Sequence, residues 1–260
     1  MRMFATLSGI LFAGSLIAAD LDPKVLKLVG PDARIIMGTD VQRYSESPLQ
    51  AMFPASLART TAGSVRQWIT ITYEEDKPPL SIFIGAPEAS EETVLLDSAT
   101  AIESDPAGVQ EALQRWRSDE KPGELAQQVR RLSSSYDNWF LLVRPLQLIA
   151  REHDDTLKYR NELMQAIDQV SGGIRLGVFN EVHVEVVTKT PDDAITIAAL
   201  AHWLPGFLQM ENSHAGPGLL VNAAENLTTT ARGNVVSISF TLSTEKLEQI
   251  MKSYRQPVED

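Results

Sequence analysis

Short segments in which apolar and polar residues alternate are the feature that most constrains the fold of this chain. Residues 65–75 and 182–188 both show the two-residue period of a strand that buries one face. Gly233 and Asn234 separate two further segments, 227–232 and 235–242, and this dipeptide favours a tight hairpin turn. The chain is therefore expected to build antiparallel hairpins.

Helix start signals lie between these segments. Asp105 and Pro106 supply an N-cap and a proline at the first helical position. Thr190 precedes a proline and two aspartates, whose charges complement the positive end of a long helix. Strands are expected at 33–39, 65–75, 80–84, 93–96, 138–144, 174–179, 182–188, 227–232 and 235–242, and helices at 49–57, from 105, at 124–132, 158–170 and 190–210, and from 243.

The order of these elements indicates the fold class. The second half runs strand, helix, strand, strand, helix, hairpin and helix, close to the βαββαβ pattern of a ferredoxin-like layer. The first half is an approximate copy, and the serine run 133–135 marks the expected boundary. The sequence predicts an α+β chain of two tandem ferredoxin-like modules, residues 20–134 and 135–260, with antiparallel sheets covered by helices on one face.

Residues 1–19 have the three parts of a secretory signal peptide. Arg2 gives a positive start, residues 4–17 are apolar or small, and Ala18 and Ala19 precede a polar turn. The apolar run is shorter than the roughly 20 residues of a membrane span. We expect cleavage after Ala18 or Ala19 and export to the periplasm or the medium.

Composition narrows the classes of partner and chemistry. The chain has no cysteine, which excludes disulfides, a lipidated cysteine, thiolate metal sites and cysteine nucleophiles. Its net charge of −11 disfavours binding to nucleic acid, and no second apolar run is long enough to span a bilayer after leader removal. The expected partner is a protein or small-molecule ligand whose identity the sequence does not indicate.

The histidines give few candidates for chemistry. None of the four lies four residues from another, and zincin and calcium-loop motifs are absent, so neither a metal nor a cofactor site is expected. His183 lies two residues before Glu185, on the same face of a strand. His153 precedes Asp154 and Asp155. The His153 group could ligate a metal or orient a base, and the His183 pair could form a site on the open face of the sheet. Solvated surface charge is the competing interpretation of both, and the catalytic residues stay unknown.

The remaining candidates favour structural roles. His202 lies in the expected long helix, where packing explains it, and Ser213 is merely adjacent to His214, a poor geometry for activating a nucleophile. No G-x-S-x-G motif occurs. Core packing is expected for at least three of the four tryptophans, which are Trp68, Trp116, Trp139 and Trp203.

Several of these segments resemble a known group of proteins. They are PDARIIMG at 31–38 with Ser47 and Pro48, residues 98–113 with the sequence VQEAL, and SYDNWF at 135–140. They are similar to uncharacterised exported proteins of soil-type bacteria, which have a leader followed by duplicated α+β modules. The resemblance implies a secreted two-module protein and assigns no catalytic residue.

Three functional hypotheses follow. The first is a non-enzymatic binding or interaction module that uses its sheet faces or the groove between modules. The second is a cell-envelope hydrolase with a site assembled from distant residues, such as His183 with Glu185 or His153 with its two aspartates. The third is an assembly subunit that pairs through an exposed strand edge. The absence of clustered catalytic residue types favours the first hypothesis over an enzyme.

Overall fold

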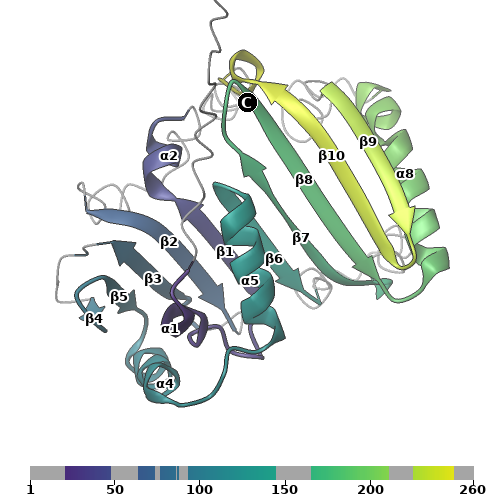
Figure 1. The fold of residues 1–260 in the computed structure, drawn as a ribbon. Helices are drawn as coiled ribbons and strands as arrows, with labels where there is room; N and C mark the ends of the chain where they lie inside the picture. The colour runs from purple at the N-terminus through teal and green to yellow at the C-terminus, as the bar shows by residue number, and fades with distance from the viewer. Residues whose placement is uncertain are drawn as a thin grey trace, which may run out of the picture.

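Ten strands form one antiparallel sheet in the order β4-β5-β3-β2-β1-β6-β7-β8-β10-β9 (Figure 1). The computed structural model describes residues 21–47, 64–73, 77–85, 87, 93–144, 165–210 and 225–248. The strands are β1 (Ile35–Asp40), β2 (Val65–Thr72), β3 (Leu80–Gly85), β4 (Val94–Leu95), β5 (Thr100–Glu103), β6 (Asn138–Val143), β7 (Ile167–Arg175), β8 (Phe179–Thr188), β9 (Glu225–Arg232) and β10 (Val235–Ser243). The helices are α1 (Pro23–Leu26), α2 (Val41–Ser45), α4 (Pro106–Arg117), α5 (Glu124–Ser135) and α8 (Pro191–Met210), and a further helix begins at 244–248.

The two halves of the chain meet in the middle of this sheet. β1 pairs with β6, which places Ile36 opposite Leu141. Asp137 adds a polar link, because its buried carboxylate accepts hydrogen bonds from the Arg43 side chain at 3.2 Å and from the Leu176 backbone N–H at 2.7 Å. The sheet therefore continues through the boundary expected at residue 134.

The α+β class is confirmed, whereas the tandem ferredoxin-like arrangement is not. The described strands form one sheet instead of two, and all nine of its pairings are antiparallel. Read outward from the centre, the order is 1-2-3-5-4 in the first half and 6-7-8-10-9 in the second. The halves thus share a strand order within a common sheet.

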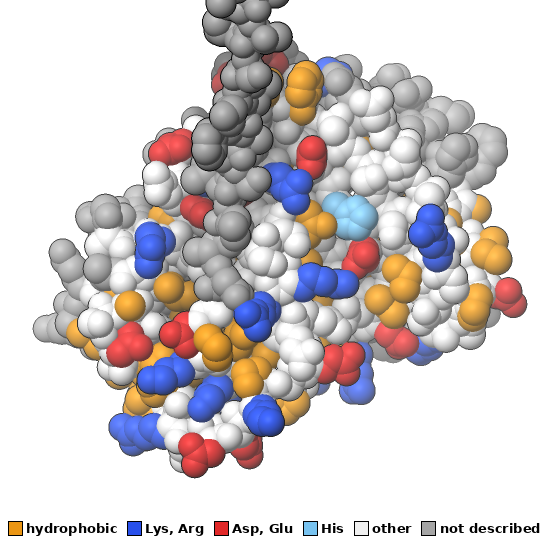
Figure 2. Space-filling model, in the orientation of Figure 1, with side chains coloured by type: hydrophobic (Ala, Val, Ile, Leu, Met, Phe, Trp, Pro, Cys, Tyr) orange, Lys and Arg blue, Asp and Glu red, His pale blue; other side chains and the backbone are white. Residues whose placement is uncertain are grey.

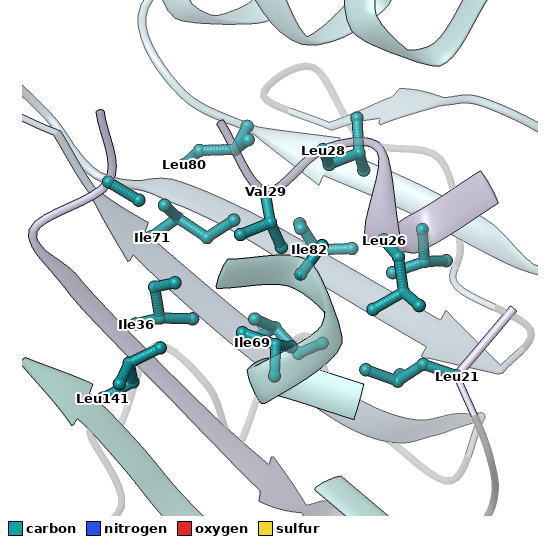
Figure 3. Close-up of a cluster of buried hydrophobic side chains, with 14 of the residues drawn as sticks. Leu21, Leu26, Leu28, Val29, Ile36, Ile69, Ile71, Leu80, Ile82 and Leu141 are labelled. Carbon is teal, nitrogen blue, oxygen red and sulfur yellow. The ribbon is translucent and has the colours of Figure 1, made fainter. Parts of the chain in front are cut away.

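The main core lies on one face of the first half, here called the front face. Side chains of α1 lie over those of β1, β2, β3 and β6 (Figure 3), and Val129 and Leu132 of α5 complete the cluster. Ile36, Ile71 and Leu141 are fully buried there. The two-residue period accounts for this, because alternate residues of each strand point to the same face.

A second core lies on the opposite, back face of the second half. Val186 and Val236 are buried there against Ala194 of α8. Cross-strand pairing fixes the faces: Leu141 of the front core lies opposite Ser171, and Ser171 lies opposite Glu185, so Val186 points the other way. α5 lies in front of the sheet and α8 behind it (Figure 1). Helices thus cover both faces of the sheet, not one as expected.

Most of the expected elements are present. The Asp105 carboxylate caps α4 by accepting from the Gly108 N–H at 2.9 Å, and Gly233 adopts φ 58° in the β9–β10 turn. Trp139 is buried in the main core, while Trp116 packs at its edge and Trp68 packs against a smaller cluster. Three elements were not expected from the sequence, namely α1, α2 and β5, because each is too short to show a clear period.

The expectation of a helix reaching residue 170 is wrong. Residues 167–175 form β7, and the pair Gly172 and Gly173 lies inside this strand instead of ending a helix. A Cβ at Gly172 would clash with the backbone oxygen of His183, and one at Gly173 would clash with the Tyr136 ring. These glycines permit close approach within the sheet.

Several expectations fall outside the described residues. They are the signal peptide at 1–19, the helix at 49–57, most of the expected 158–170 helix, the group His153, Asp154 and Asp155, and the pair Ser213 and His214. His202 lies in α8, but its side chain is not described. Within the described part of the chain, no helix combines the length and apolar character needed to cross a membrane.

Candidate functional site

A polar cluster lies on the front face of the second half, beside the C-terminal end of α5. Glu185 on β8 accepts a hydrogen bond from the Arg131 guanidinium of α5 at 3.2 Å. Its other oxygen lies 3.7 Å from Nε2 of His183. The sequence analysis expected His183 and Glu185 on one face, which is confirmed, and the structure adds Arg131.

Tyr136 lines both of the hollows that lie in this cluster. Its ring lies nearly parallel to that of His183, with an interplanar angle of 10° and centroids 6.4 Å apart. The missing side chain of Gly173 leaves room for the Tyr136 ring. Burial raises the pKa of Tyr136, and the nearby Glu185 carboxylate raises it further, so the phenol is a neutral hydroxyl at pH 7.

The first hollow is a pocket of about 120 Å³ between α5 and strands β7 and β8, here called the inner pocket. Its lining residues are Arg131, Leu132, Ser135, Tyr136, Ser171, Gly172, His183 and Glu185. Ser171 is 1% exposed, and its Oγ has no hydrogen-bond partner among the described residues. A buried hydroxyl without a partner is costly, so this residue on the pocket wall has hydrogen-bonding capacity that the described packing leaves unused.

The second hollow, here called the outer hollow, has a volume of about 370 Å³ and shares Tyr136 and His183 with the inner pocket. It is lined by Tyr136, Arg175, Glu181, Val182, His183, Asn226, Ser239, Phe240 and Thr241. Arg175 donates to Glu181 at 3.3 Å and to the backbone oxygen of Ser135 at 3.1 Å. In Figure 2 the surface over β8 and β10 is mainly white, with a histidine at its edge and little orange.

A larger hollow, of about 420 Å³, lies beside the end of α1 and the segment before α5. Two of its cations, Lys27 and Arg115, already serve the packing of the first half. Lys27 donates to the Ser118 carbonyl at 2.6 Å, and Arg115 donates to the Tyr73 hydroxyl at 2.8 Å while its guanidinium lies over the same ring. The inner pocket is the stronger candidate, because the packing of the sheet does not account for its polar groups.

The cluster does not have the geometry of an assembled catalytic centre. A nucleophile must contact its base, but the Ser171 Oγ makes no hydrogen bond to His183. No group of three or more histidine or acidic side chains within the described ranges is placed to hold a metal ion. The arrangement offers instead a mixture of hydrogen-bond donors and acceptors beside two rings, which suits ligand binding.

Three residues of the site were not predicted from the sequence: Arg131, Tyr136 and Ser171. Ser171 follows a segment expected to be helical, which hid its position opposite Glu185. Tyr136 lies just after α5, where only the tertiary structure shows that it covers Gly173. The pair Gly172 and Gly173 was the available signal, because glycines inside a strand indicate close approach by another group.

Comparisons with known proteins show that the fold of this chain is similar to that of solved structures. No family model and no curated protein matches the chain. Three solved structures of TP0453 are similar in fold: crystal form III with a TM-score of 0.54, form IV with 0.53 and form I with 0.52. They cover 89–92% of this chain and 97–100% of their own, at 10–11% sequence identity. At this identity the likeness concerns the fold alone, and it extends over nearly the whole chain.

Proposed function

We propose that this chain is an exported protein that binds a ligand without converting it, and that the inner pocket and outer hollow are its binding site. One observation carries the proposal: Ser171 lines the inner pocket, and its buried hydroxyl has no partner in the described part of the chain. Arg131, Glu185 and His183 surround the same pocket. Polar groups that packing does not require are typical of binding sites.

A two-dimensional NMR titration of the mature chain tests the binding site. Pools of small molecules, separated into sugars, carboxylic acids, amines, phosphates and short peptides, are added to labelled protein. We expect at least one pool to shift the amide signals of Ser171, Gly173 and His183. Shifts confined to the first half, or no shift with any pool, contradict the proposal.

The proposal of export rests on the signal-peptide pattern at residues 1–19. Expression of the full chain in a bacterial host tests it through the mass of the protein recovered from the periplasm or the medium. We expect a new N-terminus at Ala19 or Asp20, corresponding to cleavage after Ala18 or Ala19. Recovery of the uncleaved chain from the cytoplasm contradicts it.

A cell-envelope hydrolase is the second candidate, favoured by the 3.7 Å contact between His183 and Glu185 on the same face as Ser171. Catalysis would require the serine and histidine to meet on substrate binding. A panel of ester, phosphate and glycoside substrates tests this candidate. Turnover that is lost in His183→Ala establishes an enzyme, whereas binding without turnover supports the first proposal.

We also infer that the chain is a tandem repeat of one α+β module. The shared order of the strands, 1-2-3-5-4 and 6-7-8-10-9, supports this inference. In both halves the first strand, β1 or β6, also lies at the centre of the sheet, and the last two strands pair at its edge. Expression of 135–260 alone tests whether the second module is an independent unit. A cooperative unfolding transition supports it, and an unfolded product contradicts it.

A further inference from the structure

The pairing of charges in the site indicates the chemical class of its ligand. Arg131 is paired with Glu185, and Arg175 is paired with Glu181, at 3.2 and 3.3 Å. Each hollow therefore contains one cation and one anion that already neutralise each other. A charged ligand would have to compete with an ion pair in either hollow, whereas a neutral ligand would leave both pairs intact.

These ion pairs still have hydrogen-bonding capacity. A carboxylate accepts about four hydrogen bonds and a guanidinium donates about five. Glu185 uses one oxygen for Arg131, and its second oxygen lies 3.7 Å from Nε2 of His183, beyond hydrogen-bond length. The Ser171 hydroxyl, which can both donate and accept, lies in the same pocket without a partner among the described residues. Neutral hydroxyl groups match this mixture, because each of them donates and accepts as well.

The walls of the site are consistent with the same ligand. The rings of Tyr136 and His183 lie nearly parallel and present apolar surface at the junction of the two hollows. The outer hollow continues over β10 with the hydroxyl-bearing residues Ser239 and Thr241. Ser239 also contacts the Thr228 hydroxyl of β9 at 2.7 Å. The site therefore extends from a narrow pocket into a broader surface rich in neutral hydroxyl groups.

We propose that the inner pocket and outer hollow bind a neutral saccharide chain, with one sugar unit hydrogen-bonded to Ser171 and Glu185 and the next units lying over β10. Sugar hydroxyls satisfy the buried serine without disturbing either ion pair, and the C–H faces of a sugar ring pack on aromatic rings. This inference rests on the proposed binding function and specifies its ligand class. The outer hollow, at about 370 Å³, falls in the size range of small-molecule sites.

Calorimetric titration of the full mature chain tests the ligand class. The probes are the neutral trisaccharides maltotriose, cellotriose and chitotriose, with trigalacturonate as the acidic sugar, the chitosan trimer as the basic sugar, and trialanine as a peptide. We expect at least one neutral trisaccharide to bind, with an affinity nearly independent of salt because no net charge is neutralised. The two charged sugars should bind more weakly than their neutral counterparts.

Matched variants locate the binding. Ser171→Ala and Glu185→Gln should each weaken the binding of the neutral trisaccharide by about tenfold or more. The first removes a hydroxyl from the pocket, and the second replaces a carboxylate acceptor with an amide donor and removes the charge that pairs with Arg131. Ser134→Ala is the control, since the Ser134 hydroxyl bonds to the Arg131 carbonyl on α5 and does not line either hollow. It should bind as the parent does. Circular dichroism spectra that match the parent show that each variant is folded.

The outcomes separate this inference from the proposed function. If trigalacturonate, the chitosan trimer or trialanine binds and none of the neutral trisaccharides does, the saccharide inference is overturned while the binding function stands. If a neutral trisaccharide binds but Ser171→Ala and Glu185→Gln leave its affinity unchanged, the assigned site is wrong. If no probe binds here and no pool shifts the Ser171 region by NMR, both proposals fail.

Discussion

The front face of the sheet differs sharply between its two halves. Over the first half and the adjoining strand β6 it is an apolar core under α1 and α5, with Ile36 and Leu141 fully buried. In the second half the same face carries Ser171, His183 and Glu185, and the apolar core moves to the back face under α8. The change occurs across one strand pairing, where Leu141 of β6 lies opposite Ser171 of β7. A single sheet can therefore supply both a stable core and a polar surface on the same side.

The largest predicted effect is the loss of packing on the apolar half of this face. Leu141→Ala should lower the free energy of unfolding by about 2–5 kcal/mol, because it leaves a cavity in a fully buried cluster. Urea denaturation followed by circular dichroism measures the change. Ser239→Ala on the polar half is the comparison and should alter stability by about 0.5 kcal/mol or less. Equal effects of the two substitutions would show that the polar half is packed as tightly as the core.

The next effect concerns the junction of the two halves. Gly38 of β1 lies opposite Trp139 of β6, and a Cβ at this glycine would clash with the indole ring. Gly38→Ala should destabilise the chain by about 1–3 kcal/mol through overpacking of this buried site. Gly177→Ala is the matched control, since a Cβ added there would lie 3.4 Å from the Phe179 backbone oxygen, an ordinary contact, and its change should be about 0.5 kcal/mol or less. A tolerated Gly38→Ala would indicate that β1 and β6 are not closely packed.

These glycines also show how far the sequence predicts the fold. Alternation predicts most strands and identifies which residues share a face, as it does for His183 and Glu185. It does not identify the neighbouring strand, so it could not place Ser171 opposite Glu185 or Leu141 opposite Ser171. The pair Gly172 and Gly173 suggests a helix end in the sequence but lies inside a strand, because a glycine alone does not show whether it serves a turn or a close contact.

Tyr73 gives a moderate effect that depends on pH. Its hydroxyl donates to the Leu28 carbonyl at 2.7 Å and accepts from Arg115, so Tyr73→Phe should cost about 0.5–1.5 kcal/mol at pH 7. Burial raises the pKa of Tyr73, which Arg115 only partly offsets. The pKa of Tyr73 is therefore higher in the folded state than in the unfolded state, which stabilises the folded chain below about pH 10. This stabilisation is lost as the pH rises through the pKa of the folded state.

Parallel urea titrations of the parent and Tyr73→Phe at neutral and alkaline pH measure this dependence. The stability advantage of the parent should shrink above about pH 10, because the unfolded tyrosine ionises there first. Tyr136→Phe is the control from the polar half, where the tyrosine borders two hollows and we expect a smaller change at pH 7. An advantage of Tyr73 that grows at alkaline pH contradicts the burial of its hydroxyl.

Ser171→Ala has the smallest predicted effect on stability and gives the sharpest test of the difference between the two halves. Its hydroxyl is buried without a partner in the described part of the chain, so removing it should leave stability unchanged or raise it by up to about 1 kcal/mol. Ser133→Ala is the control, because the Ser133 hydroxyl is bonded to the Arg130 carbonyl at 3.0 Å within α5. Urea denaturation without ligand measures both. A loss of more than about 1 kcal/mol in Ser171→Ala would mean that the hydroxyl supports the fold and would remove the reason to expect a ligand beside it.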